Sequence, residues 1–572
     1  MTKSRRIFIK ECSVMATAMA VLPSITYSAK NVRGRIEDIL EKLSAINDDV
    51  VDRLMELQID KPGDRWHGGL MNNHEIPNAH ATKEIIVKLG ASYASPYSRY
   101  YRSEKLVKPM EKAIQCLLNV QYDDGTIDLY STNFHSTPDT AFIVNYLSPA
   151  YVNIQRLDRP EMKVLLEKLE VFFKNAGKCL VVGGAHTANH RWVISSALAR
   201  LNSFFPSKKY TDRIDVWLNE GIDLDPDGQY TEQSVSIYSP TCDHMFLTMG
   251  RLLDRKDLMD VVRKNLDMTL YYIQPGGEVL TDASGRQDAA RTGYVNGYYY
   301  TYLYFAIKDE NPAYSAVCQL IEQEMPKKVL HYLPYILELP IFKAVVPEPS
   351  KIPDNYIKHF SHSGVLRIRR GTTDISIIEN NPTFLSFMKG NAVLQSIRLA
   401  AAFFGERGQF MAEQTDLDGK KIVLTQAKKH GYFQPFPKDK IPGDGIYEKM
   451  PRKERELSES QIMNYKLSIS ENEGKLSIDI QVDGTDHVPV SMEMSFRPGG
   501  ELSGVTTDKD IEDSFFLEEG LGQYKVGRDK ITFGPGTVAH KWATMRGMLP
   551  KQKGNSVYIT GYTPFKHTIE LS

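Results

Sequence analysis

The spacing of the apolar residues changes once along this chain of 572 residues. Residues 35–345 repeat apolar side chains three and four positions apart, as in the run from Ile36 to Leu54, which is typical of amphipathic helices. Residues 359–572 instead alternate apolar and polar side chains, as in VSMEMSF (490–496), which is typical of half-buried strands. We therefore expect a multidomain α plus β protein, helical in its first half and built from antiparallel sheets in its second.

The boundary between the halves is rich in proline. Pro347, Pro349 and Pro353 fall in residues 346–358, which we interpret as a linker. In the second half, Glu473-Gly474 separates two alternating runs and predicts a hairpin turn. The expected domains are thus residues 35–345 and 359–572, the latter as an antiparallel β-sandwich.

Glycine-containing turns recur through the helical half. The last glycine of each turn lies 44 to 59 residues from the next, at Gly69, Gly125, Gly184, Gly228 and Gly277. That interval accommodates two helices and two turns. The repeat predicts stacked helical hairpins that wind into a solenoid or close into an (α/α) toroid.

Polar residues follow each of these turns. Equivalent turns of a repeat lie on one face, so we expect these side chains to meet at one rim, although polar loops and helix caps explain many of them individually. The candidate site residues are His135, Asp139, His186, Asn189, His190, Arg191, Trp192, Glu232, Tyr238, Arg286 and Asp288.

The segment HTANHRW (186–192) opens an apolar helix, with Thr187 as its expected N-cap. His186 and His190 are four residues apart and share a helix face. That spacing allows metal chelation, but no acidic third ligand follows the HExxH pattern. A buried structural histidine and a general acid or base are the other interpretations of His190. We predict no metal and no cofactor.

Two further segments carry chemistry. DPDGQYTEQSVSIYSP (225–240) places Glu232 and Tyr238 between helices, as catalytic groups or as loop anchors. TDASGRQDAAR (281–291) supplies Arg286 and Asp288, either as a clamp for a carboxylate or as a surface ion-pair cluster.

The N-terminus has the pattern of an export signal. Arg5-Arg6 precede a short apolar run and a polar stretch ending near Ala29, which resembles a twin-arginine signal over residues 1–29. We expect export to the periplasm or cell surface of a bacterium, with no integral membrane segment. The 70 basic and 71 acidic residues nearly cancel, so no basic face for nucleic acid is expected. Oligomeric state is not predicted.

Helical hairpins followed by a sheet domain beginning at HFSHSGVLRIRRG (359–371) resemble the heparinase II/III-like polysaccharide lyases and their alginate-lyase relatives. Asn189-His190 at a helix start and DGQYTEQSVSIY, ending at Tyr238, resemble that family's motifs. The family segment usually carries Pro after the Ser and His after the Tyr, and this chain does not. The resemblance implies β-elimination at a uronic acid, with Asn189 neutralising the carboxylate, assisted by Arg191 or Arg286, and with His190 and Tyr238 as base and acid.

Two alternatives stay open. Helical toroids also host glycoside hydrolases, such as the glucuronidases of glycoside hydrolase family 154, because a fold does not decide the chemistry. Hydrolysis requires two carboxyl groups, for which Glu232, Asp139, Asp243 and Asp288 are candidates. The third class is a non-catalytic glycan-binding protein.

Overall fold

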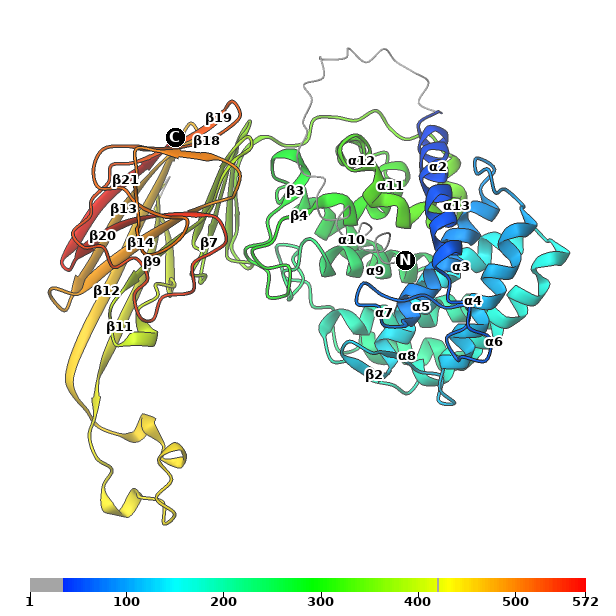
Figure 1. Ribbon diagram of the computed structural model, residues 1–572, viewed down its shortest axis with the longest axis horizontal. Helices are drawn as coiled ribbons and strands as arrows, with labels where there is room; N and C mark the ends of the chain where they lie inside the picture. Colours follow the sequence, from blue (N-terminus) through cyan, green and yellow to red (C-terminus); the bar gives the residue numbers. More distant parts are fainter. Residues whose placement is uncertain (1–33, 419–420) are drawn as a thin grey trace. The chain divides into compact units, whose positions relative to one another are not determined.

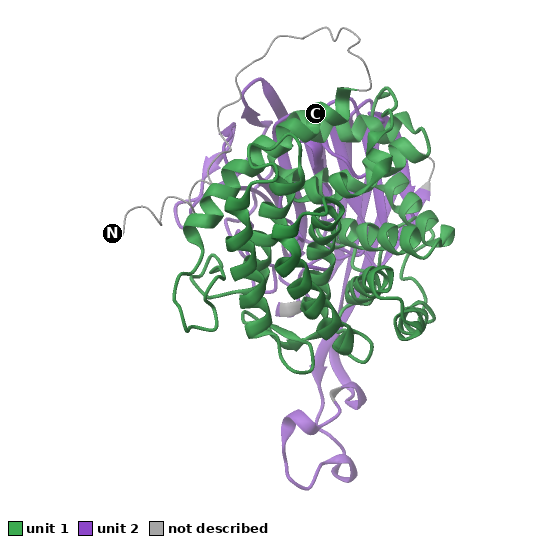
Figure 2. Cartoon of the chain, turned by 90° about the vertical axis from the view of Figure 1, so that its right-hand side faces the viewer, with its two compact units in different colours: residues 1–270, 293–352 green, residues 271–292, 353–572 purple. Residues whose placement is uncertain are grey.

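The computed structural model describes residues 34–418 and 421–572 (Figure 1). The chain divides into two compact units, coloured separately in Figure 2. Unit 1 comprises the described residues up to Leu270 together with Gly293–Ile352, and unit 2 comprises Tyr271–Thr292 and Pro353–Ser572. The expected export signal, residues 1–29, lies outside the described residues.

Unit 1 is helical, as the spacing of its apolar residues predicts. Two short strands, β1 (Ile127–Leu129) and β2 (Asn133–Ser136), form an antiparallel pair within it. Its α-helices are α2 (Gly34–Leu57), α3 (Ala79–Ala94), α4 (Val107–Val120), α5 (Thr137–Arg156), α6 (Lys163–Leu180), α7 (Ala188–Phe204), α8 (Lys208–Leu218), α9 (Tyr238–Leu252), α10 (Lys256–Thr269), α11 (Tyr299–Lys308), α12 (Pro312–Glu324) and α13 (Leu333–Glu338).

The helices of unit 1 are of two kinds, and the two kinds alternate along the chain. α3, α5, α7, α9 and α11 are buried around most of their circumference, and α3 packs on α5, α5 on α7, and α7 on α9. α4, α6, α8 and α10 bury one face each and cover the first set from outside. A helix that is apolar all round must be enclosed, whereas an amphipathic helix keeps a wet face. The pairing agrees with the expected helical hairpins.

None of the helices in the described ranges combines the length with the apolar character that a membrane crossing requires.

Unit 2 contains two large sheets. The eight-stranded sheet has the order β10 (Gln414–Asp418), β11 (Lys421–Phe433), β12 (Leu457–Asn472), β13 (Lys475–Gly484), β21 (Phe565–Leu571), β19 (Asp529–Gly534), β18 (Gly522–Val526), β15 (Glu501–Ser503). The nine-stranded sheet has the order β16 (Thr506–Thr507), β17 (Ser514–Phe516), β20 (Asn555–Tyr562), β14 (Pro489–Phe496), β9 (Ala392–Ala401), β8 (Leu385–Lys389), β7 (Thr373–Ile378), β6 (Val365–Arg370), β5 (Asn355–Phe360).

Alternation along the strands builds one core from both sheets. Buried side chains such as Leu394 and Met494 of the nine-stranded sheet join Leu467 and Ile480 of the eight-stranded sheet in a single apolar cluster. The expected hairpin turn is confirmed: β12 and β13 pair antiparallel, and Glu473 and Gly474 between them both have positive φ. One pair differs from the expected antiparallel arrangement, because β17 runs parallel to β20.

Residues 271–292 group with unit 2, although the sequence places them within the helical half. The reason is a set of polar bonds to the sheets. Arg367 and Tyr356 each donate to the carbonyl of Tyr271 at 3.0 Å, and Arg497 binds Glu278 through two bonds of 2.8 and 2.9 Å. The loop that carries Arg286 and Asp288 therefore belongs to unit 2.

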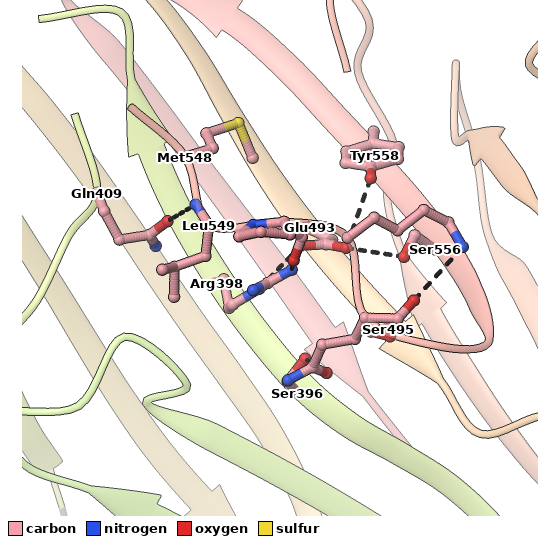
Figure 3. Close-up of polar contacts among 12 residues, drawn as sticks. Ser396, Arg398, Gln409, Glu493, Ser495, Met548, Leu549, Ser556 and Tyr558 are labelled. Atoms are coloured by element: carbon pink, nitrogen blue, oxygen red, sulfur yellow. Dashed lines mark hydrogen bonds and ion pairs between the residues drawn. The ribbon is translucent and has the colours of Figure 1, made fainter. Parts of the chain in front are cut away.

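A buried ion pair ties two central strands of the nine-stranded sheet to a long loop (Figure 3). Arg398 on β9 donates to Glu493 on β14 through Nε at 2.8 Å. The hydroxyl groups of Ser556 and Tyr558 on β20 donate to the other oxygen of the same carboxylate. Arg398 also donates to the carbonyl of Pro550 at 3.0 Å. Burying a charge is costly unless it is paired and hydrogen-bonded, and this arrangement meets both conditions.

Candidate active site

The first polar cluster lies where α3 and α5 begin. Ser136 is the N-cap of α5, and its hydroxyl accepts from the amide of Asp139 at 3.2 Å. The Asp139 carboxylate in turn accepts from Ser136 Oγ at 2.5 Å, Asn133 Nδ2 at 2.8 Å and His80 Nε2 at 3.0 Å. A local capping motif therefore holds His80, at the start of α3, against α5.

The environment of Asp139 holds its carboxyl group ionised. Burial alone would raise its pKa, but the hydrogen bonds from His80, Ser136 and Asn133 outweigh burial and lower the pKa to about 2. Asp139 is accordingly a fixed negative charge that orients His80 rather than a proton donor near neutral pH.

The stability of this cluster should depend on pH. Because the folded pKa of Asp139 is below the unfolded value of about 3.9, its contribution of roughly 2 kcal/mol is complete above that value and is lost as pH falls towards 2. We expect Asp139→Asn to lower the free energy of unfolding at pH 6 and to cost less at pH 3. Urea unfolding of both proteins at four pH values between 3 and 6 measures this, and a difference that stays constant over the range would contradict it.

A row of rings connects this cluster to the start of α7. Phe142, one turn into α5, lies with its ring centroid 6.5 Å from that of His80 and 6.1 Å from that of His190. His190 in turn lies edge-on to His186 at 4.6 Å. The N-terminal ends of α3, α5 and α7 are therefore adjacent, which brings together histidines 110 residues apart in the sequence.

Asn189 joins α7 to the segment before α9. Its side-chain amide donates to Glu232 Oε2 at 2.8 Å and to Thr187 Oγ at 3.2 Å, and the residue is fully buried. Among the described residues its Oδ1 atom is buried without a hydrogen-bond partner. Thr187 is the N-cap of α7 by position, but its hydroxyl serves Asn189 instead of a helix amide. Glu232 thus fixes the orientation of the Asn189 amide.

Tyr238 is the first residue of α9, and its position is set by Ser234. The Tyr238 amide donates to the Ser234 carbonyl at 3.1 Å and to its hydroxyl at 3.2 Å. Gln233, directly before, has a φ of 49°, so the chain turns sharply between Glu232 and Tyr238. Both predicted residues therefore belong to one tight turn beside α7.

A cavity of about 230 Å³ within unit 1 adjoins this turn. Ser236, Ile237 and Thr241 form one side, and rings of Tyr146, His244, His331 and Tyr332 line it as well. Burial lowers the pKa of His331 to about 4, with Lys88 contributing, and burial likewise lowers the pKa of His244. Both imidazoles are neutral near pH 7 and offer one donor and one acceptor each.

Three predicted residues are engaged elsewhere. His135 is more than half exposed, stacks on Tyr122 at 3.9 Å and pairs with Asp124 at 3.0 Å. Arg191 binds Asp223 at 3.0 Å, and the fully buried Trp192 donates to the same carboxylate at 2.9 Å. The bonds from Arg191 and Trp192 to Asp223 hold the start of α7, so neither of these two side chains offers a free group to a ligand.

Arg286 and Asp288 lie in unit 2. Asp288 is buried and accepts from Ser284 Oγ at 2.5 Å, and the Arg286 amide donates to the same hydroxyl at 3.1 Å. Their expected meeting with His190 and Tyr238 stays a prediction.

The sequence pattern does not predict His80, Phe142, Tyr146, His244 or His331 as site residues. His80 carries the one signal that could have identified it, because it follows Asn78 at the start of a helix after a glycine turn, as His190 follows Asn189. The others lie inside apolar helical or turn segments, where the sequence does not distinguish a site residue from a core residue.

Comparison with known proteins finds similarity in fold and none in sequence families. No protein-family model matches the sequence, and no curated protein matches it. Heparinase III is similar over 94% of this chain and 91% of its own, with 9% identity and a TM-score of 0.52. The chondroitin AC lyase of Streptomyces coelicolor A3 covers 94% and 82%, with 11% identity and a TM-score of 0.54. A Paenibacillus xanthan lyase covers 95% of this chain and 57% of its own, with 9% identity and a TM-score of 0.55. In its fold, the chain resembles solved polysaccharide lyases.

Proposed function

We propose that this protein is an exported enzyme that cleaves a uronate-containing glycan by β-elimination. In this proposal, unit 1 is an (α/α) toroid that carries the catalytic groups, and unit 2 is an antiparallel β-sandwich. The observation that carries it is the contact between Asn189 and Glu232, because it joins the start of α7, with His190, to the turn that ends at Tyr238. An amide, an imidazole and a phenol are thus anchored on two adjacent helix starts.

The chemistry follows from these three groups. A base removes the C5 proton of the uronic acid, and negative charge develops on the neighbouring carboxylate. A donor such as the Asn189 amide stabilises that charge. The C4–O bond then breaks as the C4–C5 double bond forms, and an acid protonates the leaving oxygen. His190 and Tyr238 supply the base and the acid, in an order that depends on which C5 epimer is cleaved.

Glu232 acts as a positioning residue in this mechanism. In the described structure both N–H bonds of the Asn189 amide are used, by Glu232 and by Thr187. A substrate carboxylate would replace one of these acceptors. The 230 Å³ cavity adjoins the turn through Ser236 and Ile237, and its lining does not include Asn189, His190 or Tyr238.

Glycoside hydrolysis is the second candidate, and Glu232 is the observation that favours it. A hydrolase needs a second carboxyl group as partner. Asp139 is held ionised by its hydrogen bonds. Asp243 is fully buried, accepts from Tyr230 at 2.9 Å, and has a pKa raised by burial. Asp139 is therefore unsuited to donate a proton, Asp243 is enclosed in the core of unit 1, and Asp288 lies in unit 2, so we favour elimination.

The Glu232→Gln variant distinguishes the two reactions. In a lyase the change should reduce turnover only mildly, because the glutamine carbonyl still accepts from Asn189. In a hydrolase it should nearly abolish turnover, because the carboxyl group itself transfers the proton or attacks. The measurement incubates the protein and its variant with a panel of uronate glycans and follows ultraviolet absorbance and reducing ends together.

The two readouts separate all three classes. Reducing ends with absorbance identify an unsaturated product and hence a lyase. Reducing ends without absorbance, combined with an inactive Glu232→Gln variant, would overturn the proposal in favour of a hydrolase. Binding of a glycan, together with no product from any glycan in the panel, would identify a binding protein.

A further inference from the structure

A basic groove of about 690 Å³ opens in unit 2 beside the arm formed by β11 and β12, where β11 ends and β12 begins. Figure 1 shows this arm extending from the sheet to a loop at its tip. The groove is built from three separate stretches of chain: the turn that follows β9, the ends of β11 and β12 with the loop that joins them, and the loop that carries Arg546. Its volume lies in the range of ordinary ligand sites.

The charge of the groove is of one sign. Arg407, Lys453, Arg455 and Arg546 line it, and no acidic side chain that the structure describes is among the lining residues. The chain as a whole has a net charge of −1, so this concentration of cations is local. Clustered cations in a concave surface raise the local concentration of anions and attract them from solution.

Two buried polar atoms in the groove have no partner among the described residues. They are Nδ1 of His430 and Nε of Arg455. Buried polar groups are nearly always hydrogen-bonded, because leaving one unsatisfied is costly. The Arg455 guanidinium is held between Phe436, at 4.3 Å, and Tyr447, at 4.9 Å, so its orientation is fixed.

A flat apolar face lies beside these cations. The ring of Phe404 stacks on His430 with centroids 4.4 Å apart and an angle of 28°. Phe404 has a φ of 48°, an uncommon conformation for a residue with a side chain. Gly405 follows with a φ of 63°, and a Cβ atom there would lie 3.2 Å from Arg546 Nε. The strained turn thus presents a ring and admits a guanidinium at close range.

The walls of the groove are fixed before any ligand binds. The backbone amide of Leu549 donates to Gln409 Oε1 at 3.2 Å, which ties the loop carrying Arg546 to the turn after β9 (Figure 3). The Lys428 ammonium donates to the carbonyls of Arg407 and Gln409 from the arm side. A preformed site loses less entropy when a ligand binds.

We infer that this groove is a binding site for an acidic polysaccharide, taking a segment that carries carboxylate or sulfate groups. The guanidinium and ammonium groups bind the acidic groups, and the Phe404–His430 face contacts the sugar rings. The inference rests on the proposed function in one respect, the choice of an acidic polysaccharide as the class of ligand. It assigns to unit 2 a role in holding a polymer, in addition to the reaction proposed for unit 1.

Binding by the full chain tests the inference. In the His190→Ala background, which slows cleavage, affinity electrophoresis compares chondroitin sulphate, alginate and neutral dextran. Alginate carries carboxylates alone, so the two acidic polymers separate carboxylate from sulfate recognition. Lys453→Ala with Arg546→Ala should weaken binding of the acidic polymer by about tenfold or more, because charge-assisted hydrogen bonds are lost. Dextran should not bind in either case.

A matched control removes two charges elsewhere in unit 2. Lys525 and Arg528 are exposed on the hairpin formed by β18 and β19, and replacing both by alanine changes the net charge equally. The control should keep the parent affinity. Lys453→Arg with Arg546→Lys should restore most binding, and unfolding curves verify that each variant is folded.

Three results would overturn the inference: no binding of either acidic polymer by the parent, an unchanged affinity in the groove variant, or an equal loss in the control. A failure of the proposed function would appear separately, as the absence of unsaturated product from the unmodified chain, because the binding measurement requires no turnover.

Discussion

Replacing His190 by alanine is expected to lower the turnover of a uronate glycan by about 10²–10⁴-fold, and Tyr238→Phe should do the same. Each change removes a group that carries a proton in the proposed elimination. The backbone amide of Tyr238 is bonded to Ser234, and Asn189, the neighbour of His190, is bonded through its side chain to Glu232. The loss should appear in kcat, because proton transfer stabilises the transition state more than the bound substrate.

The measurement is the initial rate of ultraviolet absorbance on one active substrate. Tyr97→Phe is the matched control, because Tyr97 is exposed in the segment that follows α3 and the change also removes one hydroxyl group. Rates within about threefold of the parent in both the His190 and Tyr238 variants would contradict the assignment of base and acid, since general acid–base groups contribute far more. Circular dichroism confirms that each variant is folded.

Asn189→Ala belongs to the same series. The amide acts on charge that develops in the transition state, so kcat should fall while KM changes less. Asn189→Ala also frees Glu232 from its 2.8 Å contact, so comparison with Glu232→Gln separates loss of the amide from loss of its orientation.

The largest expected effect on stability comes from Asp374→Ala in unit 2. Arg367 and Asp374 are fully buried on β6 and β7 and are joined by two bonds of 2.9 and 2.7 Å. Removing the carboxylate leaves a guanidinium in the core without its main counter-charge, which should lower the free energy of unfolding by about 3–5 kcal/mol. Arg367 also holds the Tyr271 carbonyl, so its displacement would loosen residues 271–292.

Urea unfolding followed by circular dichroism measures this loss. The double variant Arg367→Met with Asp374→Leu is the informative control, because it removes both charges and fills similar volume. It should recover much of the stability, since a buried ion pair is often replaced by apolar residues at little cost. A single variant as stable as the parent, or a double variant no better than the single one, would contradict the argument.

Much of the candidate site could be predicted because helix starts have local signals. HTANHRW was expected to open a helix, and α7 begins at Ala188 with Thr187 as N-cap. Glu232 and Tyr238 were expected between helices; Glu232 lies in the turn before α9, whereas Tyr238 is the first residue of that helix. What the pattern did not contain was the pairing of Asn189 with Glu232, which depends on how α7 and α9 pack.

The roles of other predicted residues were decided by neighbours distant in sequence. Arg191 and Trp192 both bind Asp223, more than thirty residues away, so their polar groups are already bonded within the protein. His80 and Phe142 join the site because α3 and α5 are adjacent through the Asp139 cluster. A single sequence shows residue type and spacing but not which capped helix ends become neighbours.

The sequence by itself determined the helical first half, the strand-rich second half, the hairpin at Glu473-Gly474 and the start of α7. Periodicity and capping act between residues a few positions apart, so they can be read along the chain. Only the tertiary structure decided that residues 271–292 join unit 2, that β17 runs parallel to β20, and that a basic groove forms beside the β11–β12 arm. Each of these depends on bonds between segments tens to hundreds of residues apart, for which local physical chemistry provides no signal.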